Sequence, residues 1–305
     1  MKNPSPSAPS RVRKAPSVKD ANDTVTARPF FKTPGGKTRL LPELRSRLPA
    51  RFEHYHEPFV GGGALFWDLA TSFRLRTNYA SLSDANPVIP RAFRAVKDNV
   101  EEVISRLEAM PVTQDHYMAI RGTTTESRAA MGDAELCAWF LFVNKTGYNG
   151  MFRVNREGKF NIPWGKWERQ KRSPTVLDAP LLRACSAVLQ RLRVSATERS
   201  FEAVLHYARR GDLVYFDPPY LPVSSTSDFT AYTKEGFSYD DHVRLRDVAL
   251  ELKNKGIHVM VSNSDVPLVR ELYERPGFLI DVVMAPRSVN SKGDRRGDVR
   301  ELVIR

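Results

Sequence analysis

The stretch Leu213-Val214-Tyr215-Phe216-Asp217-Pro218-Pro219-Tyr220 decides the fold. Its first four residues form an unbroken apolar run, which is typical of a strand buried on both faces of an α/β sheet. The tetrapeptide that begins at Asp217 therefore follows the carboxyl end of a strand. Because open α/β sheets bind their ligands at that edge, the sequence predicts a ligand site there.

This tetrapeptide carries groups that suit the exocyclic amine of a nucleobase. Asp217 provides a carboxylate that accepts hydrogen bonds, while Pro218 and Pro219 stiffen the turn and leave backbone carbonyls without local N–H partners. The flat ring of Tyr220 is suited to stacking on a base extruded from its helix. A rigid turn without chemistry is the alternative, and the tetrapeptide alone does not exclude it.

The bulk composition favours a polyanionic partner. The chain has 305 residues, a net charge of +12 and 41% hydrophobic residues. This length suits one large α/β domain with an insertion, or two domains, and the charge favours nucleic acid, although a surplus of charge also serves solubility. No stretch resembles a signal peptide or a membrane span, so we expect a cytoplasmic protein without membrane association.

Cysteine and histidine usage points away from disulfide and metal chemistry. The two cysteines, Cys137 and Cys185, lie in helix-like apolar patterns and form no CxxC motif, so we expect small core residues. His54 and His56 flank Tyr55 on one face of an expected strand. No carboxylate set accompanies them in the sequence, so we predict structural histidines and no metal.

The strand pattern divides the chain into three parts. Residues 1–28 form a basic arm rich in proline and serine, which we expect to be disordered. Residues 29–100 and 201–305 carry the strand patterns of one sheet domain. Between them, residues 101–200 show helical patterns and no strand pattern. The expected fold is an α/β, Rossmann-like sheet with an inserted, mainly helical domain, whose helices are Glu101–Met110, Glu135–Val143 and Leu181–Leu192.

A glycine cluster follows the first expected strand, which covers residues 54–60. Gly61, Gly62 and Gly63 allow a ligand to approach the backbone closely, although Phe66 stands where a dinucleotide fingerprint has its third glycine. Asp84 follows the next strand, at the place where a carboxylate contacts ribose hydroxyls. The pair favours an adenosine-containing cofactor; a tight turn and a helix cap are the alternatives.

Residues 144–172 form a basic and aromatic segment within the insertion. Its lysines and arginines suit phosphate contacts, and its aromatic residues and Met151 suit insertion into a base stack. Arg153 is the strongest candidate for reading a guanine, because a bidentate arginine is the commonest such contact. A solvated loop with a small aromatic core is the alternative. A second basic cluster is expected to contact phosphate or to be solvated: Arg287, Lys292, Arg295, Arg296 and Arg300.

From about residue 29 onward the chain resembles the Dam-type DNA adenine-N6 methyltransferases. The resemblance is carried by motifs in family order: Phe31-Lys32-Thr33-Pro34-Gly35-Gly36-Lys37, Glu57-Pro58-Phe59-Val60-Gly61-Gly62-Gly63, Ser83-Asp84-Ala85-Asn86, Asn144 to Pro163, Asp217 to Tyr220, Asp228 to Tyr232, and Val261-Ser262-Asn263. It implies methyl transfer from S-adenosyl-L-methionine to adenine N6 in double-stranded DNA, within GATC and by base flipping. It implies neither an obligate protein partner nor an oligomer, so we expect a monomer.

The resemblance also implies roles for single residues. It places the catalytic groups at Asp217, Pro218, Pro219 and Tyr220. Cofactor contacts fall on Thr33, Lys37, Phe59, Gly61, Gly63, Asp84 and Asp217, where Thr33 replaces an aromatic residue found in many relatives. DNA contacts fall on Lys32, Tyr148, Asn149, Met151, Arg153 and Pro163. The alternatives are a methyltransferase for RNA adenine or cytosine N4, and a catalytically idle, sequence-specific DNA-binding regulator.

Overall fold

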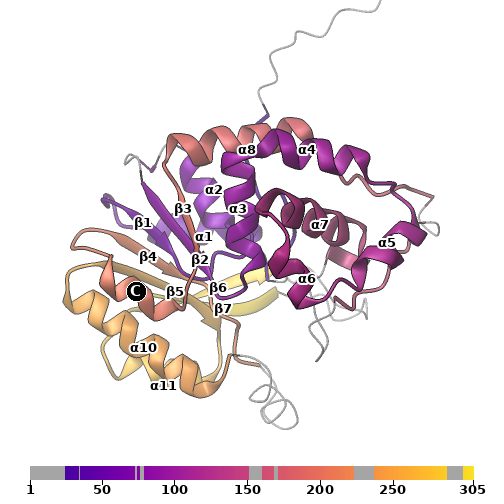
Figure 1. The fold of residues 1–305 in the computed structure, drawn as a ribbon. Helices are drawn as coiled ribbons and strands as arrows, with labels where there is room; N and C mark the ends of the chain where they lie inside the picture. The colour runs from indigo at the N-terminus through magenta and orange to yellow at the C-terminus, as the bar shows by residue number, and fades with distance from the viewer. Residues whose placement is uncertain are drawn as a thin grey trace, which may run out of the picture.

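A computed structural model describes residues 25–33, 35–72, 74–75, 79–150, 160–167, 171–222, 237–286 and 298–305. Its centre is a seven-stranded sheet with the order β3-β2-β1-β4-β5-β7-β6 (Figure 1). The strands are β1 (Tyr55–Glu57), β2 (Ala80–Asp84), β3 (Ser195–Glu198), β4 (Leu213–Phe216), β5 (His258–Ser264), β6 (Ile280–Pro286) and β7 (Asp298–Ile304). Neighbouring strands from β3 to β5 pair in parallel, whereas β7 pairs antiparallel with β5 and β6. This confirms the expected Rossmann-like α/β sheet.

Alternating side chains of the strands supply two hydrophobic cores. Leu213 and Tyr215 of β4 enter one core, and Val214 and Phe216 enter the other, so every residue of this strand is buried. The first core lies under α1 (Leu41–Arg47), α2 (Ala64–Thr71) and α3 (Val88–Asp98). The second lies under η4 (Phe201–His206), α10 (Tyr239–Asn254) and α11 (Pro267–Glu274), and Figure 1 shows α10 and α11 on the opposite side of the sheet from α2 and α3.

The connection from β2 to β3 contains the helical region. It comprises α3, α4 (Val100–Ala109), α5 (Gln114–Arg121), α6 (Thr125–Ala130), α7 (Asp133–Thr146), η2 (Tyr148–Gly150) and α8 (Ala179–Arg191). The helices α3, α4, α7 and α8 pack on one another and share the first core with the sheet. Cys137 and Cys185 are buried in that core. The division into two domains stays a prediction.

The expectation that residues 101–200 contain no strand was wrong. β3 pairs in parallel with β2 through the register Leu82↔Ala196 and forms one edge of the sheet. Only Ala196 of this strand is fully buried, so Ser195–Glu198 shows no apolar run for a sequence pattern to detect. The short helices α5 and α6 were also not expected, whereas α4, α7 and α8 match the expected ranges to within three residues at each end.

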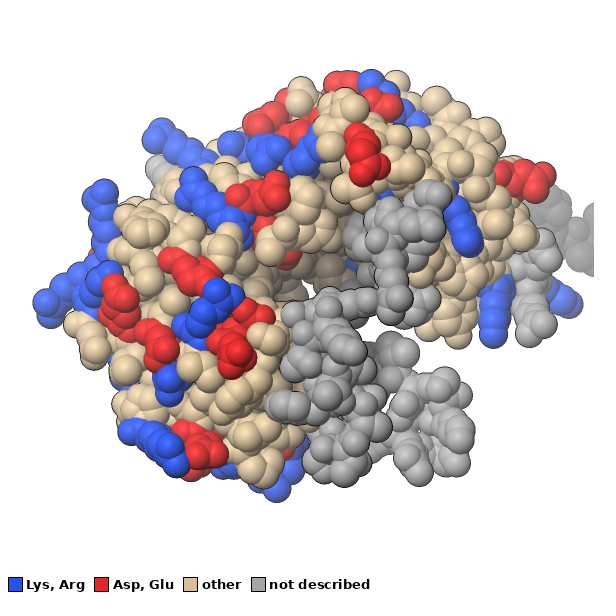
Figure 2. Space-filling view, turned by 60° about the horizontal axis from the view of Figure 1, so that its bottom comes forward, with Lys and Arg blue, Asp and Glu red and all other residues tan. Residues whose placement is uncertain are grey.

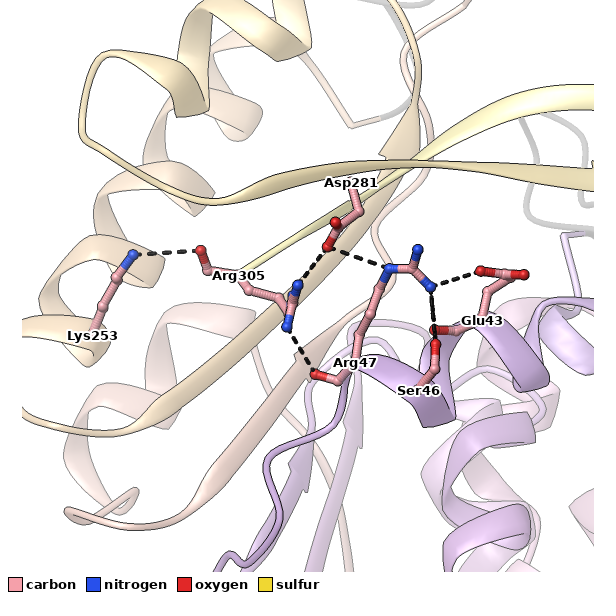
Figure 3. Close-up of polar contacts among 6 residues, drawn as sticks. All are labelled: Glu43, Ser46, Arg47, Lys253, Asp281 and Arg305. Carbon is pink, nitrogen blue, oxygen red and sulfur yellow. Dashed lines mark hydrogen bonds and ion pairs between the residues drawn. The ribbon is translucent and has the colours of Figure 1, made fainter.

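The last residue of the chain is fixed by polar contacts (Figure 3). The guanidinium group of Arg305 donates to Asp281 at 2.6 Å and to the carbonyl oxygen of Arg47 at 3.5 Å. Asp281 also pairs with Arg47 Nε at 3.3 Å, and Lys253 Nζ donates to the Arg305 carbonyl at 3.4 Å. These contacts join β6, β7, α1 and α10, so the antiparallel end of the sheet is tied to helices on both of its faces.

A second polar cluster lies at the amino ends of the parallel strands. The carboxylate of Asp212, just before β4, lies 3.1 Å from His54 Nδ1 and 2.9 Å from His56 Nε2. It also accepts the backbone N–H groups of His54 and Arg209. Although burial opposes it, the hydrogen bonds from the His56 ring and the two backbone N–H groups lower the pKa of Asp212 to about 2. Within the described part of the chain, no group of three or more metal-binding side chains is arranged to hold an ion.

Candidate active site

The direction of the sheet connections reverses between β1 and β4. From β1 the chain moves outward to β2 and β3, and from β4 it moves the other way to β5. The carboxyl ends of these two neighbours therefore border the crevice in which doubly wound sheets bind ligands. The glycine cluster follows β1, and the tetrapeptide Asp217–Tyr220 follows β4. The two motifs that sequence analysis singled out thus lie at one topological switch point.

Lys37 connects two residues of the tetrapeptide. Its Nζ lies 3.0 Å from Asp217 Oδ1 and 4.3 Å from the centre of the Tyr220 ring, and it donates to the Gly35 carbonyl at 2.8 Å. Burial raises the pKa of Asp217, while the charge of Lys37 opposes that rise. Asp217 is thus a desolvated carboxylate held by one cation, next to an aromatic ring.

Residues of three other elements hold the tetrapeptide in place. Tyr220 donates its hydroxyl proton to Glu301 of β7 at 2.9 Å. The backbone N–H of Leu221 donates to the side chain of Asn263, and the Leu221 carbonyl accepts from Ser264 Oγ at 2.7 Å. His242 of α10 lies 3.4 Å from Asn263, and burial lowers its pKa to about 4. The turn after β4 is therefore fixed from β5, β7 and α10.

No role at the site was predicted for Glu301 or His242, and Asn263 was quoted only as part of a motif. Glu301 lies in the middle of β7 and Asn263 near the end of β5, and the signal for each was a polar side chain close to an apolar run. Their contact with the tetrapeptide depends on the order β4-β5-β7, which no local pattern contains.

The glycine cluster and Asp84 form a second part of the site. Asp84 Oδ2 accepts the N–H of Gly61 at 3.1 Å, and Oδ1 accepts the N–H of Asn86 at 2.9 Å. Gly61 and Gly63 have φ values of +44° and +67°, a region that disfavours side chains. Burial raises the pKa of Asp84, and its two backbone hydrogen bonds oppose that rise. A carboxylate accepts about four hydrogen bonds, so further acceptor positions of Asp84 remain for a ligand.

The segment before Lys37 lies against this cluster. A Cβ atom added at Gly62 would lie 3.2 Å from Thr33 Oγ1, and one at Gly61 would lie 3.7 Å from Thr33 Cγ2. Thr33 is thus a small, partly exposed neighbour of the glycine backbone. Phe59 points to the second core, where its ring stacks on Phe201 at 5.4 Å between centroids. The structure therefore gives Phe59 a packing contact in addition to its predicted cofactor role.

Glu57, the last residue of β1, is a buried carboxyl group beside the site. Its Oε2 accepts the hydroxyl proton of Tyr55 at 2.8 Å. Burial raises the pKa of Glu57 well above its ordinary value, the hydrogen bond from Tyr55 opposes the rise, and the charge of Asp217 adds to it. Together with Asp84 and Asp217, three carboxyl groups with raised pKa values surround the switch point.

The predicted DNA-contacting residues Lys32, Tyr148, Asn149 and Pro163 belong to adjoining segments. The N–H of Tyr148 donates to the carbonyl of Pro163 at 2.9 Å, and an antiparallel bridge joins Gly147 and Trp164. Asn149 is exposed and has a φ of +57°. Met151 and Arg153 lie outside the described residues, as does most of the second basic cluster. Its described member Arg300 forms an ion pair with Asp265 at 2.8 Å.

Charged side chains of both signs cover the described surface in Figure 2. Lysine and arginine lie among aspartate and glutamate on this face and are not gathered by sign. Many basic residues of the segments 151–159 and 287–297 lie outside the described part. On this face the described residues therefore form no single basic patch that would account for the net charge of +12. Among the described helices, none is both long and apolar enough to cross a bilayer.

Comparison with known proteins identifies the family. Residues 34–288 match the model of the D12 class N6 adenine-specific DNA methyltransferases. The chain belongs to this family. It is similar to the Type II methyltransferase M1.LlaDCHI of Lactococcus lactis subsp. cremoris, with 37% identity over 92% of this chain and 95% of the relative. The enzyme class expected from the sequence is thereby confirmed.

Two further relatives carry different names within the same class. The Type II methyltransferase M.MjaIII of Methanocaldococcus jannaschii is 34% identical over 92% of this chain and 99% of its own length. The DNA adenine methylase of Vibrio cholerae is 32% identical over 90% of this chain and 95% of its own length. The chain is thus similar both to proteins named Type II methyltransferases and to a protein named DNA adenine methylase.

Proposed function

We propose that this adenine-specific DNA methyltransferase transfers a methyl group from S-adenosyl-L-methionine to adenine N6 within GATC in double-stranded DNA. The observation that carries the proposal is the arrangement of Asp217, Tyr220 and Lys37 at the switch point, beside the glycine cluster. A catalytically idle DNA-binding regulator requires no desolvated carboxylate there. We also propose that the protein acts as a monomer in the cytoplasm.

The cofactor pocket is assigned to the edge formed by β1 and β2. Gly61 leaves partly exposed backbone where its positive φ disfavours a side chain, and Asp84 keeps free acceptor positions for ribose hydroxyls. Gly63 is buried and keeps its predicted cofactor role as part of the same turn. Thr33 borders the same backbone. These residues fit an adenosine group without phosphates, since Gly36-Lys37-Thr38 lacks the first glycine of the phosphate-binding motif GxxxxGK[ST] and has Phe31 at that position. When bound, S-adenosyl-L-methionine supplies an electrophilic sulfonium methyl group.

The tetrapeptide is assigned to the extruded adenine. The Asp217 carboxylate and the Pro218 carbonyl accept the two N6 hydrogens, which favours a more tetrahedral nitrogen with an available lone pair. Tyr220 stacks on the base and holds it in line. Since burial raises the pKa of Asp217, its carboxylate is a better acceptor for the proton that N6 loses during or after transfer.

Recognition of the site is assigned to Lys32, Tyr148, Asn149, Met151, Arg153 and Pro163. Of the described members, Lys32 and Asn149 are exposed and lie on segments joined by hydrogen bonds. Exposed polar side chains on a fixed backbone suit contacts with base edges. Arg153 is proposed to read one guanine through two hydrogen bonds.

Sequencing tests this assignment. The protein is expressed in a host without its own DNA methylation, and modified bases are mapped on the host genome. We expect N6-methyladenine at GATC. Modification at another adenine-containing sequence would refute the GATC assignment alone. Modified cytosine, or modified RNA with unmodified DNA, would refute the proposed substrate.

A further inference from the structure

Asn144 is a buried polar residue that connects two segments of the site. It lies in α7, two residues before the end of the helix, and its side chain is fully buried. Asparagine is an unfavourable helix residue, and a buried amide is costly unless it is hydrogen-bonded. Here it is well satisfied, since Oδ1 accepts from Lys32 N at 3.0 Å and Nδ2 donates to the carbonyls of Lys32 at 3.0 Å and Gly150 at 2.8 Å.

On one side this amide holds the segment that borders the cofactor pocket. It pairs with both backbone groups of Lys32, as a neighbouring strand would. The next residue, Thr33, lies against Gly61 and Gly62, and Gly61 in turn donates to Asp84. The position of Lys32 is therefore fixed by Asn144 and by the packing of its neighbour on the glycine cluster.

On the other side the amide holds the turn that carries the recognition residues. Gly150 has a φ of +65°, and a Cβ atom added there would lie 2.8 Å from Lys32 Cδ. Tyr148 and Asn149 precede Gly150 directly, and the backbone N–H of Tyr148 donates a hydrogen bond to the carbonyl of Pro163. The Asn144 side chain thus bridges the backbones of Lys32 and Gly150. The absence of a side chain at Gly150 leaves room for the side chain of Lys32.

We propose that Asn144 is a positioning residue that couples cofactor binding to DNA recognition. The inference rests on the proposed function, because it takes the glycine cluster as the cofactor pocket and Lys32 with residues 148–150 as DNA contacts. A ligand on the glycine cluster restrains Thr33, and Asn144 transmits that restraint from Lys32 to Gly150. By linkage, DNA that engages Lys32 and Asn149 must tighten cofactor binding by the same factor.

Calorimetry with a non-reactive ligand measures this coupling. The Kd of S-adenosylhomocysteine is determined for the full chain, alone and with a saturating short duplex that contains one GATC site. For the unmodified protein we expect the duplex to lower this Kd by about fivefold or more, within the range common for linked sites. Asn144→Asp keeps the acceptor for Lys32 N but loses both donors. We therefore expect the ratio of the Kd without duplex to the Kd with duplex to fall to about one, while the Kd without duplex stays unchanged.

A second variant and a control separate coupling from stability. Gly150→Ala leaves Asn144 intact but crowds the Lys32 side chain and strains a backbone with a φ of +65°. It displaces Gly150 from Lys32 by another route, so it should abolish the coupling as well. Thr146→Val removes a buried hydroxyl that, among the described residues, donates to the Phe142 carbonyl within α7, and it should keep the ratio of the unmodified protein. All three variants are checked for cooperative thermal unfolding.

Three results would contradict the proposal. Retention of the full ratio by Asn144→Asp and Gly150→Ala would remove Asn144 from the coupling. A ratio of about one in the unmodified protein, with both ligands bound, would refute the coupling and leave the proposed function intact. Failure of the unmodified protein to bind S-adenosylhomocysteine would refute the proposed cofactor, and failure to bind the duplex would refute the GATC assignment.

Discussion

Carboxyl groups at the two ends of the parallel strands have pKa values shifted in opposite directions. At the amino ends, Asp212 accepts hydrogen bonds from two histidines and two backbone N–H groups, and its pKa falls to about 2. At the carboxyl ends, burial raises the pKa values of Glu57, Asp84 and Asp217. The first arrangement stabilises the ionised carboxylate, whereas at the carboxyl ends the polar contacts do not offset the effect of burial. The difference indicates which end is shaped for a ligand.

Asp217→Asn should produce the largest effect at the carboxyl end. The amide replaces one acceptor oxygen by a donor and removes the charge, so we expect methyl transfer to fall by about 10²–10³-fold, the loss typical of one preorganised electrostatic group. The free energy of unfolding should rise at neutral pH, because a carboxylate with a raised folded-state pKa destabilises the protein once it is ionised. Steady-state assays and chemical denaturation measure both quantities. If Asp217→Asn keeps the rate of methyl transfer, or unfolds more easily than the unmodified protein at neutral pH, the contrast between the two ends of the strands is wrong.

Asp212→Asn should have the opposite profile. The folded-state pKa of Asp212 is about 2 and its ordinary value is 3.8, so its ionised form contributes about 2 kcal/mol of stability. That stability is present above about pH 4 and is lost as the pH falls from about 4 to about 2. We expect the variant to lose it at pH 7 and to show a flatter acid limb. Chemical denaturation across this pH range at constant ionic strength measures the difference. A parallel loss of stability in the unmodified protein and in Asp212→Asn would contradict the assignment.

Asp84→Ala should act on cofactor binding. Loss of the carboxylate leaves ribose hydroxyls without a charged partner, which costs about 1–3 kcal/mol. Calorimetry with S-adenosylhomocysteine measures the change. The variant should also shift the Gly61 backbone, since the carboxylate accepts its N–H. Unchanged affinity would reduce Asp84 to a support for the glycine cluster and the start of α3.

Glu301→Ala should give the smallest effect. Loss of the acceptor frees the Tyr220 hydroxyl, and one such hydrogen bond contributes about 0.5–1.5 kcal/mol. We expect a fall in kcat without a change in cofactor Kd. Glu301→Gln should restore most of the rate, because its amide oxygen accepts the same hydrogen bond. A variant that loses stability but keeps its kcat would make Glu301 purely structural.

The sequence predicted most of the sheet and the residues around the switch point. The run Leu213–Phe216 and the glycine cluster are visible because burial on both faces and positive φ values impose strict residue choices. β3 was missed because it is an edge strand with one fully buried residue, and such a strand places few restrictions on its sequence. Lys37 was placed with the cofactor by resemblance, and only the fold shows its contact with Asp217 and Tyr220.

Long-range partners were the least predictable part. The pairing of Asp212 with His54 and His56 joins residues that are far apart in sequence, and a separate carboxylate is not visible in the pattern around the histidines. The same is true of Glu301 and Tyr220. Such contacts follow from strand order, so they become visible only once the sheet is assembled.

Nucleoside analysis of treated DNA tests the central claim most directly. Unmethylated duplex DNA is incubated with labelled S-adenosyl-L-methionine and either the unmodified protein, Asp217→Asn or Asp212→Asn, at a temperature where all three are folded. The DNA is then digested, and its nucleosides are separated. We predict labelled N6-methyl-2′-deoxyadenosine from the unmodified protein and from Asp212→Asn, and almost none from Asp217→Asn. Equal labelling by Asp217→Asn, or label only in another nucleoside, would contradict the account.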